Sequence, residues 1–173
     1  RTRHNASGAQ VLGLTLEGKM AYLNKIQVQA GVTLQQSHYS KPHIWNKEAP
    51  AVKKMMRTPN TYGYFTATYT PIKPLSIALS GTYTGSMLVP HEPVPGFLEN
   101  PITVNTKDFF DIGLKAAYDF KLYKSMNLQV NAGIQNIFNA YQDDFDKGAD
   151  RDSGYIYGPS LPRSFFAGVK ISY

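Results

Sequence analysis

The residues best able to do chemistry in this sequence are its histidines and a run of aspartates. The histidines are His4, His38, His43 and His91. No two of them have the i, i+4 spacing that places two ring nitrogens on one helix face for a metal ion. They fall in predicted loops or at predicted strand ends, so we expect solvated histidines. Contact with haem or a metal chelate is the alternative.

The aspartate run consists of Asp143, Asp144, Asp146, Asp150 and Asp152. Calcium favours clustered carboxylate oxygens of this kind. The pattern of an EF-hand counted from Asp144 fails, however, because Tyr155 replaces the closing Glu. Calcium in the Asp143–Asp152 loop is one interpretation, and neutralisation of the run by Lys147 and Arg151 is the other. We predict no further cofactor or metal.

No arrangement of residues in the sequence indicates catalysis. No serine has the surroundings of a nucleophile elbow, and the absence of cysteine excludes thiolate chemistry and disulfides. The net charge is +6, but the basic residues are scattered and their densest group, Lys47 to Arg57, falls in a predicted loop. We therefore predict neither an enzyme nor a nucleic-acid interface.

The elements that must position these residues are strands with one apolar and one polar side. In 26–35, for example, aliphatic residues alternate with Gln, Gly and Thr, which is the period of a strand. Mean hydropathy is −0.32, and no apolar run approaches the roughly 20 residues of a membrane helix. Alternating membrane strands average to such a polar-looking sequence. We expect strands near residues 11–22, 26–35, 62–70, 75–84, 110–120, 128–135 and 165–173.

The connections between these strands alternate between short and long. Short turns are expected near residues 23–25, 71–74 and 123–125, and long loops at about 40–60, 89–106 and 142–162. Long loops without secondary structure are uncommon in compact soluble domains. A rim of short turns opposite a rim of long loops is typical of outer-membrane barrels, so ligand binding is predicted on the long loops.

The polar side of the strands carries charges that suit a water-filled lumen and would be prohibitive in an apolar core. These charged residues are Glu17, Lys19, Asp111, Lys115, Asp119 and Lys170. Aromatic residues gather near both strand ends, as in the two girdles of a membrane barrel. We assign Tyr22, Tyr69, Tyr118, Phe120 and Tyr173 to the short-turn girdle. The long-loop girdle would contain Tyr39, Tyr62, Tyr64, Tyr83, Phe109, Phe110, Tyr141 and Phe165.

The predicted fold class is therefore all-β: a segment of an antiparallel transmembrane β-barrel with about seven strands, whereas single-chain bacterial barrels have even strand numbers. We expect residues 1–173 to be one part of a larger barrel. The chain begins at Arg1 without an initiator Met or signal peptide, which we interpret as a processed or excised piece.

Several segments resemble TonB-dependent outer-membrane receptors. Residues 158–173 resemble the closing strand of those receptors, and 136–141 (NIFNAY) resembles the Asn-Leu-Phe-Asn signature of the penultimate strand. Residues 13–18 (GLTLEG) resemble the recurrent Gly-x-Glu-x-Glu strand, with Thr15 departing from it. Tyr83 to Met87 and the Asp-rich loop resemble receptors of Bacteroidetes-type bacteria.

The resemblance implies a barrel of the 22-strand type in the bacterial outer membrane, closed by an N-terminal plug. It implies import of a scarce ligand (an iron chelate, haem, cobalamin or a glycan) with energy relayed by TonB. The implied partners are outer-membrane lipid and lipopolysaccharide, the plug and upstream strands, TonB, and the barrel-assembly machinery. Gly168, Ile171 and Tyr173 match the spacing of the assembly signal, although Phe166 stands at a usually polar position. A porin-like passive pore or a loop-displaying adhesin is the alternative.

Overall fold

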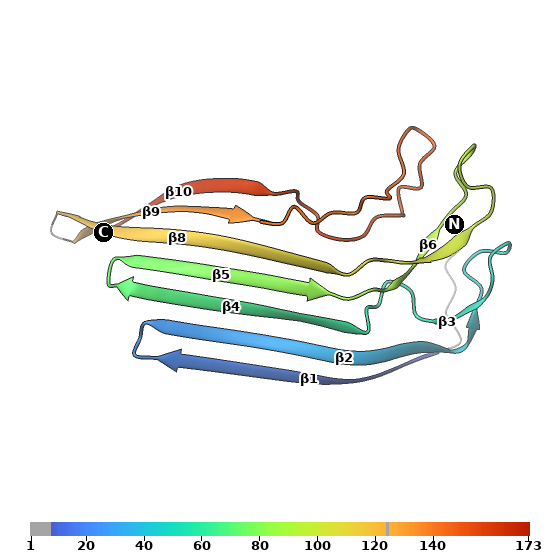
Figure 1. The fold of residues 1–173 in the computed structure, drawn as a ribbon, viewed down its shortest axis with the longest axis horizontal. Helices are drawn as coiled ribbons and strands as arrows, with labels where there is room; N and C mark the ends of the chain where they lie inside the picture. The colour runs from blue at the N-terminus through green and yellow to red at the C-terminus, as the bar shows by residue number, and fades with distance from the viewer. Residues whose placement is uncertain (1–7, 124) are drawn as a thin grey trace.

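The dominant feature of the computed structural model, which describes residues 8–123 and 125–173, is a single sheet of long antiparallel strands (Figure 1). The order is β1-β2-β4-β5-β8-β9-β10, so each long strand pairs with its neighbour along the chain. These strands are β1 (Ala9–Tyr22), β2 (Ile26–His43), β4 (Thr61–Ile72), β5 (Leu75–Thr84), β8 (Phe109–Tyr123), β9 (Met126–Gln135) and β10 (Ser164–Ser172). The predicted antiparallel strands are confirmed. His4 lies outside the described residues.

The turn between β1 and β2 shows how local sequence joins these strands. Leu23 and Asn24 both have positive φ, 48° and 52°, and the Lys25 N–H donates to the Tyr22 carbonyl at 2.9 Å. Two left-handed central residues give the turn whose twist matches that of the flanking strands. The predicted turn at 23–25 is therefore a tight hairpin connection.

The register gives the sheet one apolar and one polar face. Leu114 pairs with Leu79 and Ile134, whereas Lys115 pairs with Ala78 and Gly133. Directly opposed residues share a face, so the alternation predicted for each strand continues across the sheet. Bonds across the polar face run from Gln29 Nε2 to Tyr64 OH at 3.0 Å, from Tyr64 OH to Glu17 Oε1 at 3.3 Å, and from Gln129 Nε2 to Asp119 Oδ1 at 2.9 Å.

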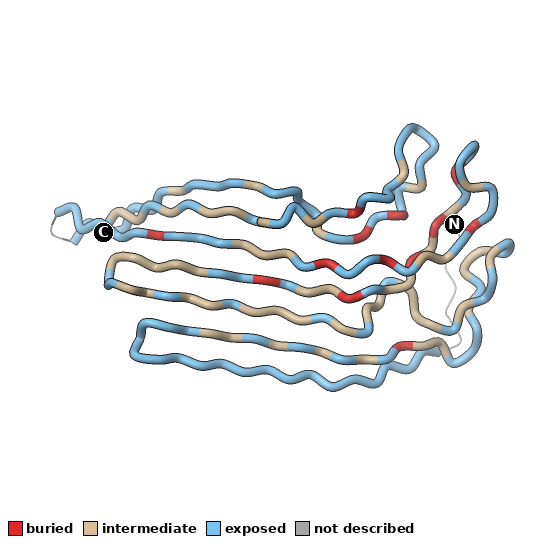
Figure 2. The backbone as a smooth tube through the Cα atoms, viewed as in Figure 1, coloured by how far each residue is buried: buried red, intermediate tan, exposed pale blue. Residues whose placement is uncertain are grey.

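Among residues 8–123 and 125–173, no second layer of secondary structure packs against the apolar face. Leu12 is 74% exposed and Val169 66% exposed, and most of the sheet is drawn as exposed or intermediate in Figure 2. The buried cluster of Val89, Phe109, Tyr155 and Tyr157 instead involves the long connections. An apolar face of this extent requires a covering medium or partner. Among the described residues, no helix is long and apolar enough to cross a membrane.

Two of the predicted long loops contain strands, so their prediction as structureless loops was wrong there. β2 continues to His43 and pairs with β3 (Val52–Lys54), while β6 (Leu88–His91) pairs with β7 (Ile102–Asn105). Pro90 argued against a strand in this part of the sequence. It is tolerated because a two-stranded sheet consists entirely of edges, where a missing N–H can face away from the partner.

The aromatic girdles also need a correction at the long-loop end. Tyr62 and Tyr64 pair with Thr33 and Gly31, which places both on the polar face rather than the apolar one. Phe166 is likewise on the polar face, opposite Gly133. A Cβ at Gly133 would approach Phe166 Cζ to 2.4 Å, so the missing side chain there makes room for the ring. This contact explains the one aromatic residue that interrupts the polar side of β10.

Candidate functional site

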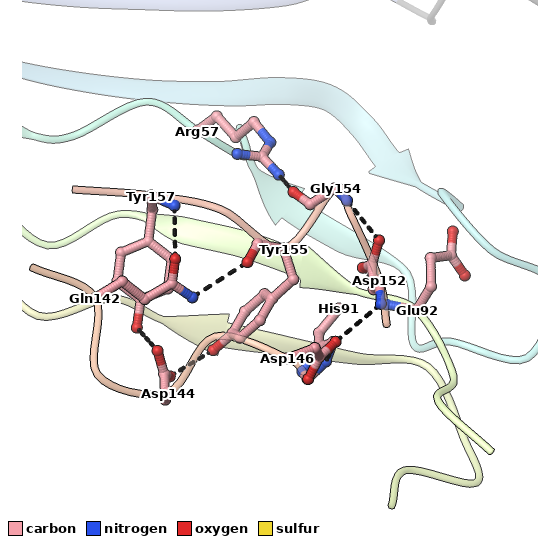
Figure 3. Close-up of polar contacts among 10 residues, drawn as sticks. All are labelled: Arg57, His91, Glu92, Gln142, Asp144, Asp146, Asp152, Gly154, Tyr155 and Tyr157. Atoms are coloured by element: carbon pink, nitrogen blue, oxygen red, sulfur yellow. Dashed lines mark hydrogen bonds and ion pairs between the residues drawn. The ribbon is translucent and has the colours of Figure 1, made fainter. Parts of the chain in front are cut away.

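The three long connections, residues 44–60, 85–108 and 136–163, meet at one end of the sheet (Figure 1). Arg57 joins them. Its backbone N–H donates to the Leu88 carbonyl at 2.7 Å, and its Nη1 donates to the Ile156 carbonyl at 3.0 Å. Its Nη2 donates to the Gly154 carbonyl (Figure 3). Through its backbone and its side chain, this one residue therefore connects three segments that are far apart in the sequence.

His91 lies at the centre of this assembly and is only 5% exposed. Its Nε2 lies 2.9 Å from Asp146 Oδ2, and its ring stacks on Tyr155 with centroids 3.8 Å apart and an interplanar angle of 2° (Figure 3). The expectation of a solvated histidine is therefore wrong for His91. His38 and His43 belong to the extension of β2, and the described histidines do not converge on a metal site.

Asp144 accepts two tyrosine hydroxyls, from Tyr155 at 2.7 Å and from Tyr157 at 2.5 Å. Burial opposes ionisation of Asp144, but the bonds from Tyr157, Tyr155 and Gln142 outweigh it and lower the carboxyl pKa. Burial, followed by the bond to Asp144, raises the pKa of Tyr157 to about 12 and that of Tyr155 further. Gln142 completes the arrangement, since its amide accepts from the Tyr157 N–H at 2.9 Å and donates to the Tyr155 carbonyl at 3.2 Å.

Two further aspartates of the run, Asp143 and Asp152, are used in the same way, as separate hydrogen-bond acceptors. Asp143 pairs with Lys107 at 2.5 Å, and Asp152 accepts the backbone N–H groups of Glu92 and Gly154 at 2.9 and 2.8 Å. Within residues 8–123 and 125–173, no three His, Cys, Asp or Glu side chains are grouped as metal ligands. The carboxylates therefore stabilise the loop, and the partners of Asp143 and Asp144 are not the Lys147 and Arg151 of the sequence analysis.

Asn136 holds the two ends of the 136–163 connection together. It is 1% exposed and has a φ of 48°. Its Nδ2 donates to the carbonyls of Ala140 and Leu161 at 2.8 and 2.9 Å, and its Oδ1 accepts the Ala140 N–H at 2.8 Å. Asn139, also left-handed, accepts the Arg163 N–H at 3.0 Å. The NIFNAY segment thus fixes the chain immediately before β10.

A cleft of about 720 Å³ opens within this connection. Its wall combines the exposed apolar residues Tyr141, Phe145 and Ile156 with two cations and two carboxylates, Lys147, Arg151, Asp146 and Asp152. The two carboxylates already accept bonds from His91 and from the Glu92 N–H, which leaves the cations available to a ligand. A volume of this size and a mostly apolar lining are typical of sites for drug-sized ligands. The predicted ligand-binding loop 142–162 therefore contains a cleft, which stays a candidate site.

The same connection extends over the polar face of the sheet. Gly158, with a φ of 90°, lies against the Phe109 ring, and a Cβ there would approach that ring to 2.9 Å. Ser160 lines a second cleft, of about 440 Å³, together with Thr82 and Asp111 of the polar face. Residues 158–161 therefore cover part of the surface that the sequence analysis assigned to the lumen.

The predicted assembly signal lies along the outer strand of the sheet. Gly168 pairs with Asn131 and Ile171 with Leu128, which puts Ile171 on the apolar face. Tyr173 follows β10 and is fully exposed. Their recognition by an assembly machinery stays a prediction.

Sequence reasoning missed Arg57, Asn136 and Gln142 as the residues that hold the loops together. No local pattern marks Arg57 or Gln142, because their partners lie in distant segments. Tyr155 and Tyr157 carried a usable signal, since residues two apart in extended chain point the same way. That spacing predicts that their hydroxyls can share one acceptor.

Comparisons with known proteins extend this description at the level of fold. No protein-family model matches the sequence, and no curated protein matches it. The structure is similar to the ferric-catecholate import receptor Fiu of E. coli K12, with 20% sequence identity and a TM-score of 0.63. The match covers 93% of this chain and 20% of the receptor chain, so this chain spans about a fifth of the receptor. The all-β fold predicted from the sequence is confirmed as an antiparallel sheet that matches part of a TonB-dependent receptor barrel.

Proposed function

We propose that this chain forms part of the barrel wall of an outer-membrane transporter that imports a scarce ligand with energy relayed by TonB. The observation that carries the proposal is the two-faced sheet, whose fold matches part of the barrel of an import receptor. Its apolar face faces lipid, and its polar face, bearing Lys115 and Asp119, lines the lumen. Residues 1–173 are then the C-terminal part of a longer receptor that includes a plug.

The free edges of the sheet support a larger barrel. In the described residues β1 pairs only with β2, and β10 only with β9. Unpaired backbone groups in hydrocarbon cost several kcal/mol each, so both edges need further strands within a membrane. The upstream strands of the receptor supply them, and the assembly machinery reads Gly168, Ile171 and Tyr173 on the last strand.

The 720 Å³ cleft is the proposed contact for the ligand. Lys147 and Arg151 favour an anionic ligand, and Tyr141, Phe145 and Ile156 favour one with an apolar or aromatic body. Among the expected classes, ferric catecholates and haem fit this chemistry, because both combine a net negative charge with an aromatic body. A ferric catecholate, which the similar receptor imports according to its description, is the first ligand to test.

Coverage of the polar face favours a gated transporter over a porin-like passive pore. Residues 158–161 lie against Phe109, Thr82 and Asp111, and so narrow the space over the lumen face. A loop-displaying adhesin remains the outcome if no ligand is transported.

The deciding experiment measures uptake of radiolabelled ferric catecholate by Gram-negative cells that express the full-length receptor. We expect uptake that disappears when TonB is deleted. Replacing Lys147 and Arg151 with Gln should weaken ligand binding at least tenfold, while Lys53→Gln, an exposed change on β3 outside the cleft, should not. Uptake that continues without TonB would establish a passive pore. Absence of uptake for every ligand class would favour the adhesin.

A further inference from the structure

The first two short turns carry lysines and no carboxylates. Lys25 lies in the first turn and Lys73 in the second, and neither turn contains Asp or Glu. Asp119, the nearest carboxylate on β8, lies on the polar face, where it accepts a bond from Gln129 and shares that face with Lys121. The long connections at the other end mix both signs. We call Lys25 and Lys73 the cationic rim.

Backbone bonds to neighbouring strands fix the two turns in the sheet. The Thr70 N–H donates to the Lys25 carbonyl at 2.7 Å, and the Asp119 N–H donates to the Pro74 carbonyl at 2.8 Å. The first turn is thus fixed beside β4, and the second beside β8. Lys25 and Lys73 are both exposed. The ion pairs within residues 8–123 and 125–173 are His91–Asp146 and Lys107–Asp143, so neither rim lysine is in an ion pair there.

An apolar hollow of about 270 Å³ lies next to this rim on the apolar face. Leu75, two residues after Lys73, pairs with Tyr118 and forms one end of it. The Tyr118 and Phe120 rings, 4.6 Å apart, form a wall, and Ala116 and Ala132, opposite each other in the register, leave the space open. The hollow presents almost no polar surface, which suits a hydrocarbon chain.

We propose that the cationic rim and the hollow bind an anionic phospholipid, with the phosphate beside Lys73 and one acyl chain against Ala116 and Ala132. The inference rests on the proposed function, because only a barrel wall presents this face to lipid. Burial of hydrocarbon alone would not distinguish one phospholipid from another. The uncompensated lysines supply that distinction, since each Lys near an anionic lipid surface contributes about a fivefold preference.

The test uses the full-length receptor in detergent micelles and native mass spectrometry with phosphatidylglycerol and phosphatidylcholine in equal amounts. Wild-type receptor should retain phosphatidylglycerol preferentially. Replacing Lys25 and Lys73 with Gln should reduce that preference by about 25-fold at low salt. Replacing Lys53 and Lys54 with Gln removes the same charge from the opposite end and should leave the preference unchanged. A preference that survives the rim substitutions, or falls equally in both variants, overturns the proposal.

Ala132→Leu tests the acyl site without changing any charge. The larger side chain fills the hollow, so bound phosphatidylglycerol should decrease, while Lys73→Arg should retain it. Unchanged binding by Ala132→Leu would overturn the placement of the chain. TonB-dependent uptake separates the two proposals: a receptor that imports its ligand but shows no lipid preference refutes only the lipid site. A receptor that fails to enter membranes refutes the proposed function as well.

Discussion

Replacing Asn136 should release the 136–163 connection from the sheet. Asn136→Ala removes three hydrogen bonds, of 2.8, 2.8 and 2.9 Å, and leaves the Ala140 N–H and the carbonyls of Ala140 and Leu161 without them. At about 1 kcal/mol for each group, with about 1 kcal/mol more for an alanine in the left-handed region, the cost is about 4 kcal/mol. That is near a thousandfold increase in the open population of the loop.

Two further substitutions separate the contributions. Asn136→Gly tolerates the φ of 48° and should show only the hydrogen-bond part of the loss. Asn136→Asp keeps the acceptor for the Ala140 N–H but turns a carboxylate oxygen toward two carbonyl oxygens, so it should be nearly as disruptive as alanine. Asn100→Ala, an exposed change between β6 and β7, is the control and should be silent.

The assay is the rate of trypsin cleavage at Lys147 and Arg151 in the full-length receptor, reconstituted in vesicles. Heat-modifiable migration on a gel verifies that the barrel remains folded in each variant. We expect rapid cleavage in the alanine and aspartate variants, and slow cleavage in wild type and Asn100→Ala. Equal cleavage rates in Asn136→Ala and wild type would show that Asn136 does not hold the loop.

The remaining predictions concern facing, sidedness and pH. Leu114→Arg should destabilise the barrel by about 2–4 kcal/mol in lipid, whereas Lys115→Gln on the polar face should be nearly silent; equal unfolding of both would reverse the faces. Trypsin added to intact cells should cleave at the exposed Lys53 and spare Lys73, and cleavage at Lys73 alone would invert the topology. Because its bonds to Tyr157 and Tyr155 lower the Asp144 pKa, Asp144 should stabilise the loop above its unfolded pKa near 4 and lose that effect as pH falls through the folded value. Proteolysis of the loop should therefore accelerate in acid, and Asp144→Asn should remove this acceleration.

The sheet was predictable from the sequence because its causes are local. The alternation of Ile26 to Gln35 and the hairpin residues Leu23 and Asn24 act within a few positions, and the structure has both. Tyr62 and Tyr64 could also have been assigned correctly, since they alternate with Gly63 and Phe65. The girdle assignment failed because it used distance from the strand end and ignored the facing of each residue.

The loop assembly was not predictable because its causes are distant in sequence. His91 reaches Asp146 across 55 positions, and Arg57 reaches Ile156 across 99. Burial of His91 depends on the position of Tyr155, which depends in turn on Asp144 and Gln142. No single segment carries this information, so the histidine could not be distinguished from a solvated one.

The hydrogen bonds of Asn136 shorten the path by which the last strand, β10, reaches the sheet. Between β9 and β10 the chain makes a long excursion, and closing a flexible loop of that length costs about 3 kcal/mol of chain entropy. Asn136 directly follows β9 and donates a hydrogen bond to the Leu161 carbonyl, three residues before β10 begins. Once this hydrogen bond forms, only residues 162 and 163 separate the fixed Leu161 from β10. The pairing of β10 with β9 then resembles the closing of a local hairpin. Insertions between Ala140 and Leu161 should therefore lengthen the loop without slowing the arrival of the final strand.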